Sequence, residues 1–220
     1  MDNRHFIARR AARYFHSGDV VNLGIGIPSL CGNYAESGVL FQTENGFIGV
    51  GATAQGIEIS DRLFNAGGIP YLPALGGCAF DVAKSFGIIR SGRMAATVLG
   101  ALQVSQHGDL ANWATPGRAF GMGGAMDLCN GAKQVIVAME LVAKDGSPKV
   151  VSRCTLPLTA KDQKEVFQEL IEETLGDSCD YQVVREIHDN LHELAEEKKD
   201  SPDPVMLSQA EVRNLLSISG

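Results

Sequence analysis

The sequence of 220 residues lacks any long apolar run and any concentration of positive charge. A membrane-spanning helix needs about 18 consecutive apolar residues, and no segment approaches that length. The net charge is −7, and Lys198 and Lys199 lie in an acidic run that is typical of a solvated helix face. These absences argue against a membrane protein and against nucleic-acid binding. No apolar signal-peptide stretch opens the sequence either, so we expect a soluble, reduced, cytoplasmic protein.

The cysteines and histidines form no ligand pattern. Five cysteines are widely spaced without a C-x-x-C pair, which argues against both a disulfide framework and a zinc site. His188 and His192 have the i,i+4 spacing of one helix face, but in their acidic, polar surroundings a solvated pair is favoured over a shared metal. We therefore expect no metal site.

Glycine, by contrast, is abundant. The 25 glycines are about 11% of the chain, against an average usage of about 7%. One cluster, Gly24-Ile25-Gly26-Ile27-Pro28, follows the short apolar segment 20–23. It is not a G-x-G-x-x-G motif, because Ser29 replaces the third glycine, and it has no P-loop lysine. A tight, closely packed turn and a ligand-cradling loop are equally good interpretations.

A second glycine cluster spans residues 121–128, with the sequence GMGGAMDL. Successive small residues at the start of a helix leave backbone N–H groups exposed, and such groups can bind an anion or an oxyanion. Close packing at an ordinary helix start explains the same glycines.

Glu44 is the most informative single residue. It follows an apolar strand expected over residues 39–43, and Gly46, Gly49 and Gly51 force turns after it. No Lys or Arg occurs from residue 39 to residue 61 to pair with this carboxylate, and a buried carboxylate is costly without a task or a partner. Glu44 is either a strand-end residue that caps a turn or reaches water, or a nucleophilic or general-base carboxylate.

Strands and helices alternate along the first 160 residues. Apolar strands at 20–23, 39–43, 95–104 and 134–141 alternate with helices at 3–16, 29–35 and 80–89, whereas 52–77 is rich in turn residues. The pattern predicts a layered α/β fold with a mostly parallel sheet and flanking helices, in which ligands bind at the carboxyl ends of strands.

The character of the sequence changes after this segment. Residues 161–220 are acidic and helical in pattern, with a linker-like break at Ser201-Pro202-Asp203-Pro204. We expect a core over residues 1–160 and a helical C-terminal extension over 161–220 that packs on the core or beyond it.

Several motifs, in one order, resemble family I coenzyme A transferases, specifically the beta (B) subunit of the 3-oxoacid or acetate–butyrate-acetoacetate type. Residues 41–49 (FQTENGFIG) resemble the active-site signature, and residues 21–28 (VNLGIGIP) resemble an entry loop of that subunit. The other matching segments are 99–104 (LGALQV), 108–113 (GDLANW), 121–128 (GMGGAMDL) and 154–159 (CTLPLT). Together they extend over roughly the first 161 residues.

The resemblance implies a fold shared with sugar-phosphate isomerases of the ribose-5-phosphate type. It implies a separate alpha (A) subunit that carries much of the coenzyme A surface, and therefore a hetero-oligomer. It further implies that coenzyme A moves between an acyl-CoA and a short-chain carboxylate or 3-oxoacid through a glutamyl-CoA thioester on Glu44. Coenzyme A thioester would be a substrate, with no permanently bound cofactor.

The resemblance also assigns roles around Glu44. Backbone N–H groups in the second glycine cluster would bind the developing oxyanions, while the first cluster would shape a neighbouring wall and the turn residues would hold Glu44. The residues concerned are Gly123, Gly124 and Ala125 for the oxyanion, Gly24 and Gly26 for the wall, and Asn45 and Gly46 for the turn.

Two segments depart from the family pattern. Family members read Arg-Gly-Gly-His with an Asp two residues later, whereas residues 90–95 read RSGRMA, and residues 162–220 do not follow the family's C-terminal pattern. These departures support a second hypothesis, a non-catalytic paralogue that keeps the fold and binds a partner. Sugar-phosphate isomerase activity would rest on fold analogy alone, and the context of Glu44 argues against it.

Overall fold

The structure is a computed structural model that describes residues 2–105 and 107–161. These residues belong to two compact units. The first contains the chain up to Gly100 together with Gly123–Ile136, and the second contains Ala101–Met122 together with the chain from Val137 onward. The helical extension expected over 161–220 lies outside the described residues, apart from Lys161.

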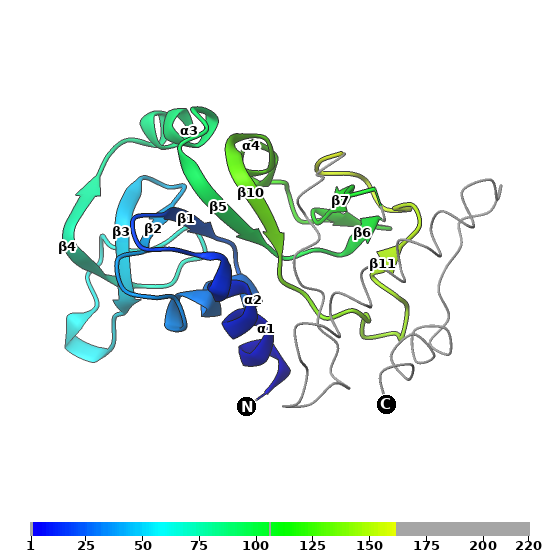
Figure 1. The fold of residues 1–220 in the computed structure, drawn as a ribbon, viewed down its shortest axis with the longest axis horizontal. Coiled ribbons are helices and arrows are strands. Elements are labelled where there is room, and N and C mark those ends of the chain that lie inside the picture. The colour runs from blue at the N-terminus through cyan, green and yellow to red at the C-terminus, as the bar shows by residue number, and fades with distance from the viewer. Residues whose placement is uncertain (1, 106, 162–220) are drawn as a thin grey trace. The chain divides into compact units, whose positions relative to one another are not determined.

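A six-stranded sheet is the centre of the first unit (Figure 1). Strand β1 pairs in parallel with both β2 and β5, and β3 and β4 continue the sheet as antiparallel strands. The parallel-rich sheet confirms the predicted α/β fold class. In spatial order the strands are β10 (Ala132–Val137), β5 (Met94–Leu99), β1 (Val20–Leu23), β2 (Leu40–Thr43), β3 (Phe47–Thr53) and β4 (Tyr71–Ala79).

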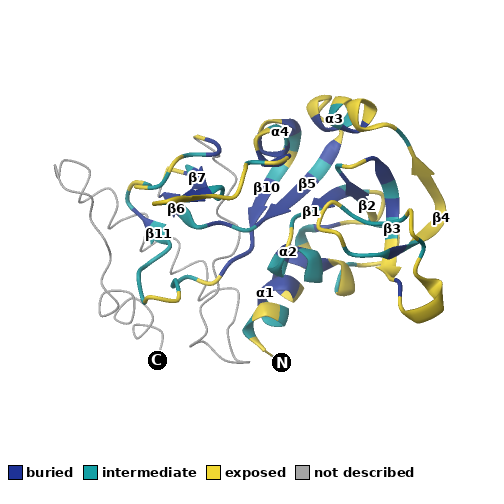
Figure 2. Ribbon diagram, turned by 180° about the vertical axis from the view of Figure 1, so that it is seen from behind, coloured by how far each residue is buried: buried dark blue, intermediate teal, exposed yellow. Residues whose placement is uncertain are grey.

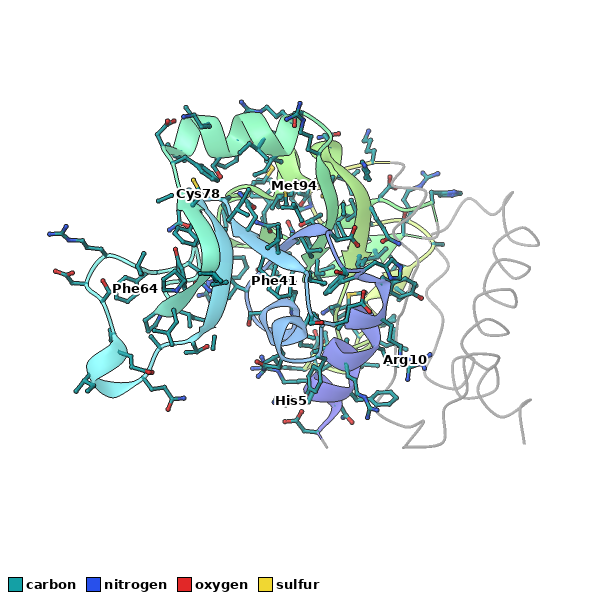
Figure 3. The ribbon with its side chains drawn as sticks, turned by 60° about the vertical axis from the view of Figure 1, so that its left-hand side comes forward. His5, Arg10, Phe41, Phe64, Cys78 and Met94 are labelled. Atoms are coloured by element: carbon teal, nitrogen blue, oxygen red, sulfur yellow. The ribbon has the colours of Figure 1, made fainter. Side chains whose placement is uncertain are left out.

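Helices cover both faces of this sheet. Figure 1 shows α3 (Val82–Arg90) and α4 (Ala125–Gly131) next to each other on one face, with α1 (Asn3–Ala11) and α2 (Ile27–Leu30) on the other. Consecutive residues of β2 point to opposite faces. Phe41 packs edge-on against Phe15 beside the N-terminal helices (Figure 3), so Gln42 faces α3. Short 3₁₀ helices lie at Ala12–Tyr14, Cys31–Asn33 and Gly56–Glu58.

Within the six-stranded sheet, the buried residues concentrate along β1, β5 and β10 (Figure 2). Val21, Val98 and Ile136 are fully buried, one from each of these strands. Their apolar side chains on both sheet faces explain why the sequence of these strands does not alternate.

Two expectations about the strands were wrong. Residues 95–104 form two strands, β5 and β6 (Gln103–Ser105), because the chain turns after Leu99 and the Leu102 N–H donates to the Ala111 carbonyl of the second unit. Residues 52–77, expected to be loops, include the end of β3 and most of β4. The proline and paired glycines of β4 lower its strand propensity, and pairing with β3 overrides that preference.

The second unit is built from short strands. A three-stranded sheet has the order β11 (Val150–Val151), β6, β7 (Leu110–Ala111), and a two-stranded sheet pairs β8 (Ala114–Thr115) with β9 (Arg118–Ala119). Within the described ranges, no helix has both the length and the apolar character needed to cross a membrane.

Candidate functional site around Glu44

Glu44 occupies the tight turn between β2 and β3, at the carboxyl end of β2. The Gly46 N–H donates to the Thr43 carbonyl at 3.0 Å, and the Phe80 N–H donates to the Gly46 carbonyl at 2.9 Å. Gly46 has φ 121°, and any side chain there would overlap the Phe80 carbonyl oxygen. Only glycine fits this conformation and this space, so the turn that carries Glu44 depends on Gly46.

The Glu44 carboxylate is half-buried and its two oxygens lie in different surroundings. Asn22 Nδ2 donates to Oε2 at 3.1 Å. Oε1 faces Gly124, where an added Cβ would lie 3.6 Å from Oε1, 3.4 Å from Glu44 Cγ and 3.5 Å from the Phe86 ring. The salt bridges found in the described part of the chain do not include Glu44. Its nearest polar partner is therefore an amide, not a cation.

Asn22 belongs to a buried hydrogen-bond network that continues away from Glu44. Asn22 Nδ2 also donates to Gln42 Oε1 at 2.8 Å and to the Gln42 carbonyl at 3.3 Å. Gln42 Nε2 in turn donates to Ser85 Oγ, in helix α3, at 2.8 Å. Asn22, Gln42 and Ser85 are 1%, 2% and 0% exposed, so this chain of polar groups is enclosed by the core.

The start of α4 brings part of the second glycine cluster to Glu44. Gly124 precedes the helix, Ala125 is its first residue, and the first N–H groups of a helix have no partner within it. Arg90 Nε of α3 donates to Asp127 Oδ1 of α4 at 2.6 Å, and Asp127 raises the pKa of the Arg90 guanidinium. This ion pair ties together the two helices that border Glu44. Gly123, with φ 52°, has nothing within 4 Å of an added Cβ.

The remaining residues assigned from the sequence make local contacts of their own. The Gly24 N–H donates to the Val98 carbonyl at 2.8 Å, so it is occupied within the sheet. Gly26, with φ 91°, precedes α2. Asn45 is exposed, accepts from Thr43 Oγ1 and donates to the Phe64 carbonyl at 2.7 Å. Asn45 therefore fastens the following loop to the turn.

Cys129, the cysteine in the helix that borders Glu44, is not placed to act as a nucleophile. Cys129 of α4 is buried, and desolvation raises its thiol pKa to about 12, so it is protonated at neutral pH. Across residues 2–105 and 107–161, no group of three His, Cys, Asp or Glu side chains is arranged to hold a metal ion.

Sequence reasoning missed Asn22, which donates to Glu44, and it missed Gln42 and Ser85, which continue the hydrogen-bond network behind Asn22. The available signal was a polar residue in the middle of each of two apolar strands, VVNL and LFQT. Register explains the contact, because Asn22 lies directly beside Gln42 in the sheet. Nothing in the sequence around Ser85 distinguishes it from an ordinary helix residue.

The departure at residues 90–95 lies at the opposite end of the sheet. Thr97 of β5 lies beside Asn22, and Arg93 precedes Thr97 by four residues, about 13 Å along a strand. Glu44 follows the carboxyl end of β2, beyond Gln42. Arg93 thus lies just before the amino end of β5, whereas Glu44 follows the carboxyl end of β2; Ala95 lies within β5, two residues before Thr97.

Fold and site together define a class: α/β proteins with a carboxylate at the carboxyl edge of the sheet, next to a glycine-rich helix start. The family model for coenzyme A transferase matches residues 5–184, and this chain belongs to that family. It is 49% identical over 164 residues to the beta subunit of the acetate CoA-transferase of Escherichia coli K12, an alignment that covers 73% of this chain and 74% of the relative. It is 46% identical over 162 residues to the B subunit of the probable succinyl-CoA:3-ketoacid coenzyme A transferase of Bacillus subtilis, covering 72% and 74%.

A human mitochondrial relative, succinyl-CoA:3-ketoacid coenzyme A transferase 2, is 46% identical over 164 residues and is matched over 32% of its length. This chain therefore corresponds to about a third of that longer protein. Relatives of similar length are named as beta or B subunits, which supports a transferase that works with a separate partner subunit.

Solved structures support the fold. An acyl-CoA transferase from Escherichia coli O157:H7 has a TM-score of 0.56 at 21% identity, covering 73% of this chain and 32% of that one. The glutaconate coenzyme A-transferase of Acidaminococcus fermentans has a TM-score of 0.52 at 17% identity, covering 72% and 62%. A variant of the AibA/AibB decarboxylase has a TM-score of 0.56 at 17% identity, covering 77% and 70%. One fold carries more than one chemistry, so the reaction must be argued from the site.

Proposed function

We propose that this chain is the beta subunit of a 3-oxoacid type CoA-transferase whose nucleophile is Glu44. The observation that carries the proposal is the setting of the carboxylate, with Oε2 held by Asn22 and Oε1 directed at the glycine start of α4. A half-buried carboxylate without a cationic partner is a better nucleophile than one in water, because it is less solvated.

The proposed reaction starts with attack of a Glu44 oxygen on the thioester carbonyl of an acyl-CoA. The C–S bond breaks, coenzyme A thiolate leaves, and an acyl-glutamyl anhydride forms. The thiolate then attacks the Glu44 carbonyl of the anhydride, which releases the first carboxylate and leaves a glutamyl-CoA thioester. A second carboxylate reverses these steps and departs as the new acyl-CoA, so that Glu44 is regenerated.

Each step passes through a tetrahedral centre whose oxygen carries negative charge. Fixed N–H donors stabilise such an oxygen more effectively than water does. In this proposal the backbone at Gly123, Gly124 and Ala125 supplies them, and the position of Gly124 beside Glu44, where an added Cβ would lie 3.6 Å from Oε1, supports the assignment. Gly46 and Asn45 hold the nucleophile in its turn, and Gly24 and Gly26 shape the wall beside it.

The proposed substrates are a coenzyme A thioester and a short-chain carboxylate or 3-oxoacid, and the proposed partner is an alpha subunit. Relatives named as subunits of acetate and succinyl-CoA:3-ketoacid transferases support these classes. The complex of the two subunits is therefore the form in which activity should be measured.

The test is the turnover of Glu44→Gln in the reconstituted complex, with Glu58→Gln as a matched control. Glu58 is exposed in a short 3₁₀ helix, so the same chemical change there should leave turnover intact. Loss of the nucleophile should reduce kcat by at least about a thousand-fold. Full turnover by Glu44→Gln would exclude Glu44 as the nucleophile, whereas a wild-type complex that binds its partner but shows no turnover would favour the non-catalytic paralogue.

A further inference from the structure

The orientation of the Asn22 side chain is fixed by its neighbours. Its Nδ2 faces three oxygens: the Gln42 carbonyl, Gln42 Oε1 and Glu44 Oε2. A main-chain carbonyl and a carboxylate can only accept hydrogen bonds. Rotating the amide by 180° would place its oxygen against these acceptors, so the N–H groups must point toward Glu44.

The orientation of Gln42 follows from that of Asn22. Because Gln42 Oε1 accepts from Asn22, Gln42 Nε2 is left to donate on the other side, where it meets Ser85 Oγ at 2.8 Å. A serine hydroxyl can accept this hydrogen bond from a buried position on α3. Asn22 thus donates both to Glu44 and to Gln42, and Gln42 donates onward to Ser85, so that each of these donors has an acceptor.

We propose that Gln42 and Ser85 are positioning residues for Glu44, a role that rests on the proposed function of Glu44 as nucleophile. Gln42 Oε1 accepts a hydrogen bond from Asn22, and Ser85 Oγ of α3 accepts one from Gln42 Nε2. Together they keep the Asn22 N–H on Glu44 Oε2, and Oε1 remains the oxygen that is free to attack. Neither residue touches the carboxylate itself.

Core stability alone does not explain these residues. A buried amide and hydroxyl that are hydrogen-bonded to each other add only modestly to stability, and replacing both by apolar side chains of the same shape is often nearly neutral or stabilising. Thr97 provides the internal comparison. It lies beside Asn22 in the same buried row, is 0% exposed, and its Oγ1 has no hydrogen-bond partner in the described structure. Thr97 is polar and buried but outside the network that ends at Glu44.

The experiment compares three variants of the chain in the reconstituted complex. Gln42→Met keeps the volume and removes both amide atoms, Ser85→Ala removes the last hydroxyl, and Thr97→Val is the matched control from the same row. We expect Gln42→Met to lower kcat about ten- to a hundred-fold at unchanged KM, because a nucleophile displaced by a fraction of an ångström reacts more slowly. Ser85→Ala should show a smaller loss in the same direction, and Thr97→Val should show none.

Crystal structures of the same complexes give a second readout that does not depend on turnover. In Gln42→Met the Glu44 carboxylate should leave its wild-type position or occupy more than one, whereas in Thr97→Val it should stay. An unmoved, singly ordered Glu44 in Gln42→Met would overturn the proposal, as would equal losses of kcat in Gln42→Met and Thr97→Val. If the wild-type complex itself showed no transferase activity, the proposed function would fail, while the position of Glu44 would still decide the positioning role.

Discussion

Two regions of the six-stranded sheet depart from the usual burial of apolar residues and exposure of polar ones. The centre buries polar residues, and the edge exposes apolar ones. At the centre, Thr97, Asn22 and Gln42 form a fully buried polar row across β5, β1 and β2. At the edge, β4 exposes every residue from Pro73 to Ala79, including Leu75, with no charged side chain among them (Figure 2). Both patterns are unfavourable unless something compensates.

The compensation differs between the two regions. The central row is regularly paired, and within it Asn22 donates both to Gln42 and to the Glu44 carboxylate, whereas Thr97 stays outside this network. The edge is irregular: its pairing with β3 shifts register twice, Pro73 removes a donor, and Gly76 has φ 83°. Such irregularities keep an edge strand from templating the addition of another strand. Regular strand pairing thus accompanies the buried polar row, and irregular pairing accompanies the exposed edge.

The largest expected difference in stability concerns two glycines with left-handed backbone. Gly46→Ala at the Glu44 turn would force a methyl group into the Phe80 carbonyl, and we expect a loss of about 3 kcal/mol in the free energy of unfolding. Gly76→Ala on β4 also has a positive φ but nothing within 4 Å, so we expect about 1 kcal/mol. Urea unfolding of both variants measures the difference, and equal losses would show that space at Gly46 is unimportant.

A second pair of variants compares burial directly. Val98→Ala at the centre removes two fully buried methyl groups and should lower the free energy of unfolding by about 2 kcal/mol. Leu75→Ala at the edge removes a fully exposed side chain and should change it by less than about 0.5 kcal/mol. These values apply to the chain by itself in chemical denaturation. A large loss in Leu75→Ala would contradict the exposure of β4.

The smallest expected effect is a difference in reactivity among the cysteines, which can be measured on the chain without any substitution. Cys78 on β4 is exposed (Figure 3). Cys129 is buried, and desolvation raises the pKa of its thiol to about 12. Desolvation also raises the thiol pKa of Cys154, to about 11. The thiolate is the reactive form, so raising the pH should accelerate labelling of Cys154 while Cys129 stays protected by burial. In peptide mapping after brief treatment with iodoacetamide at pH 8, Cys78 should be modified before either. Early modification of Cys129 would contradict the packing of α4.

Sequence patterns predicted the parts of this site that depend on neighbouring residues. The turn at Glu44 follows from an apolar strand followed by glycines, and the short helix after Gly124 follows from its glycine cluster. The hydrogen bond between Gln42 and Ser85 joins residues 43 positions apart, and no local pattern encodes it. Strand β4 was missed for the same reason, because its pairing with β3 outweighs an unfavourable local sequence.

The most direct test of the account is mass spectrometry of the Glu44 peptide. The chain, co-expressed with its partner subunit, would be incubated with acetoacetyl-CoA and trapped with borohydride. Glu44 as nucleophile predicts a covalent change on the peptide that contains Glu44, and its absence from the Glu44→Gln complex. An unmodified peptide in an intact complex, after several acyl-CoA substrates, would contradict the glutamyl-thioester mechanism.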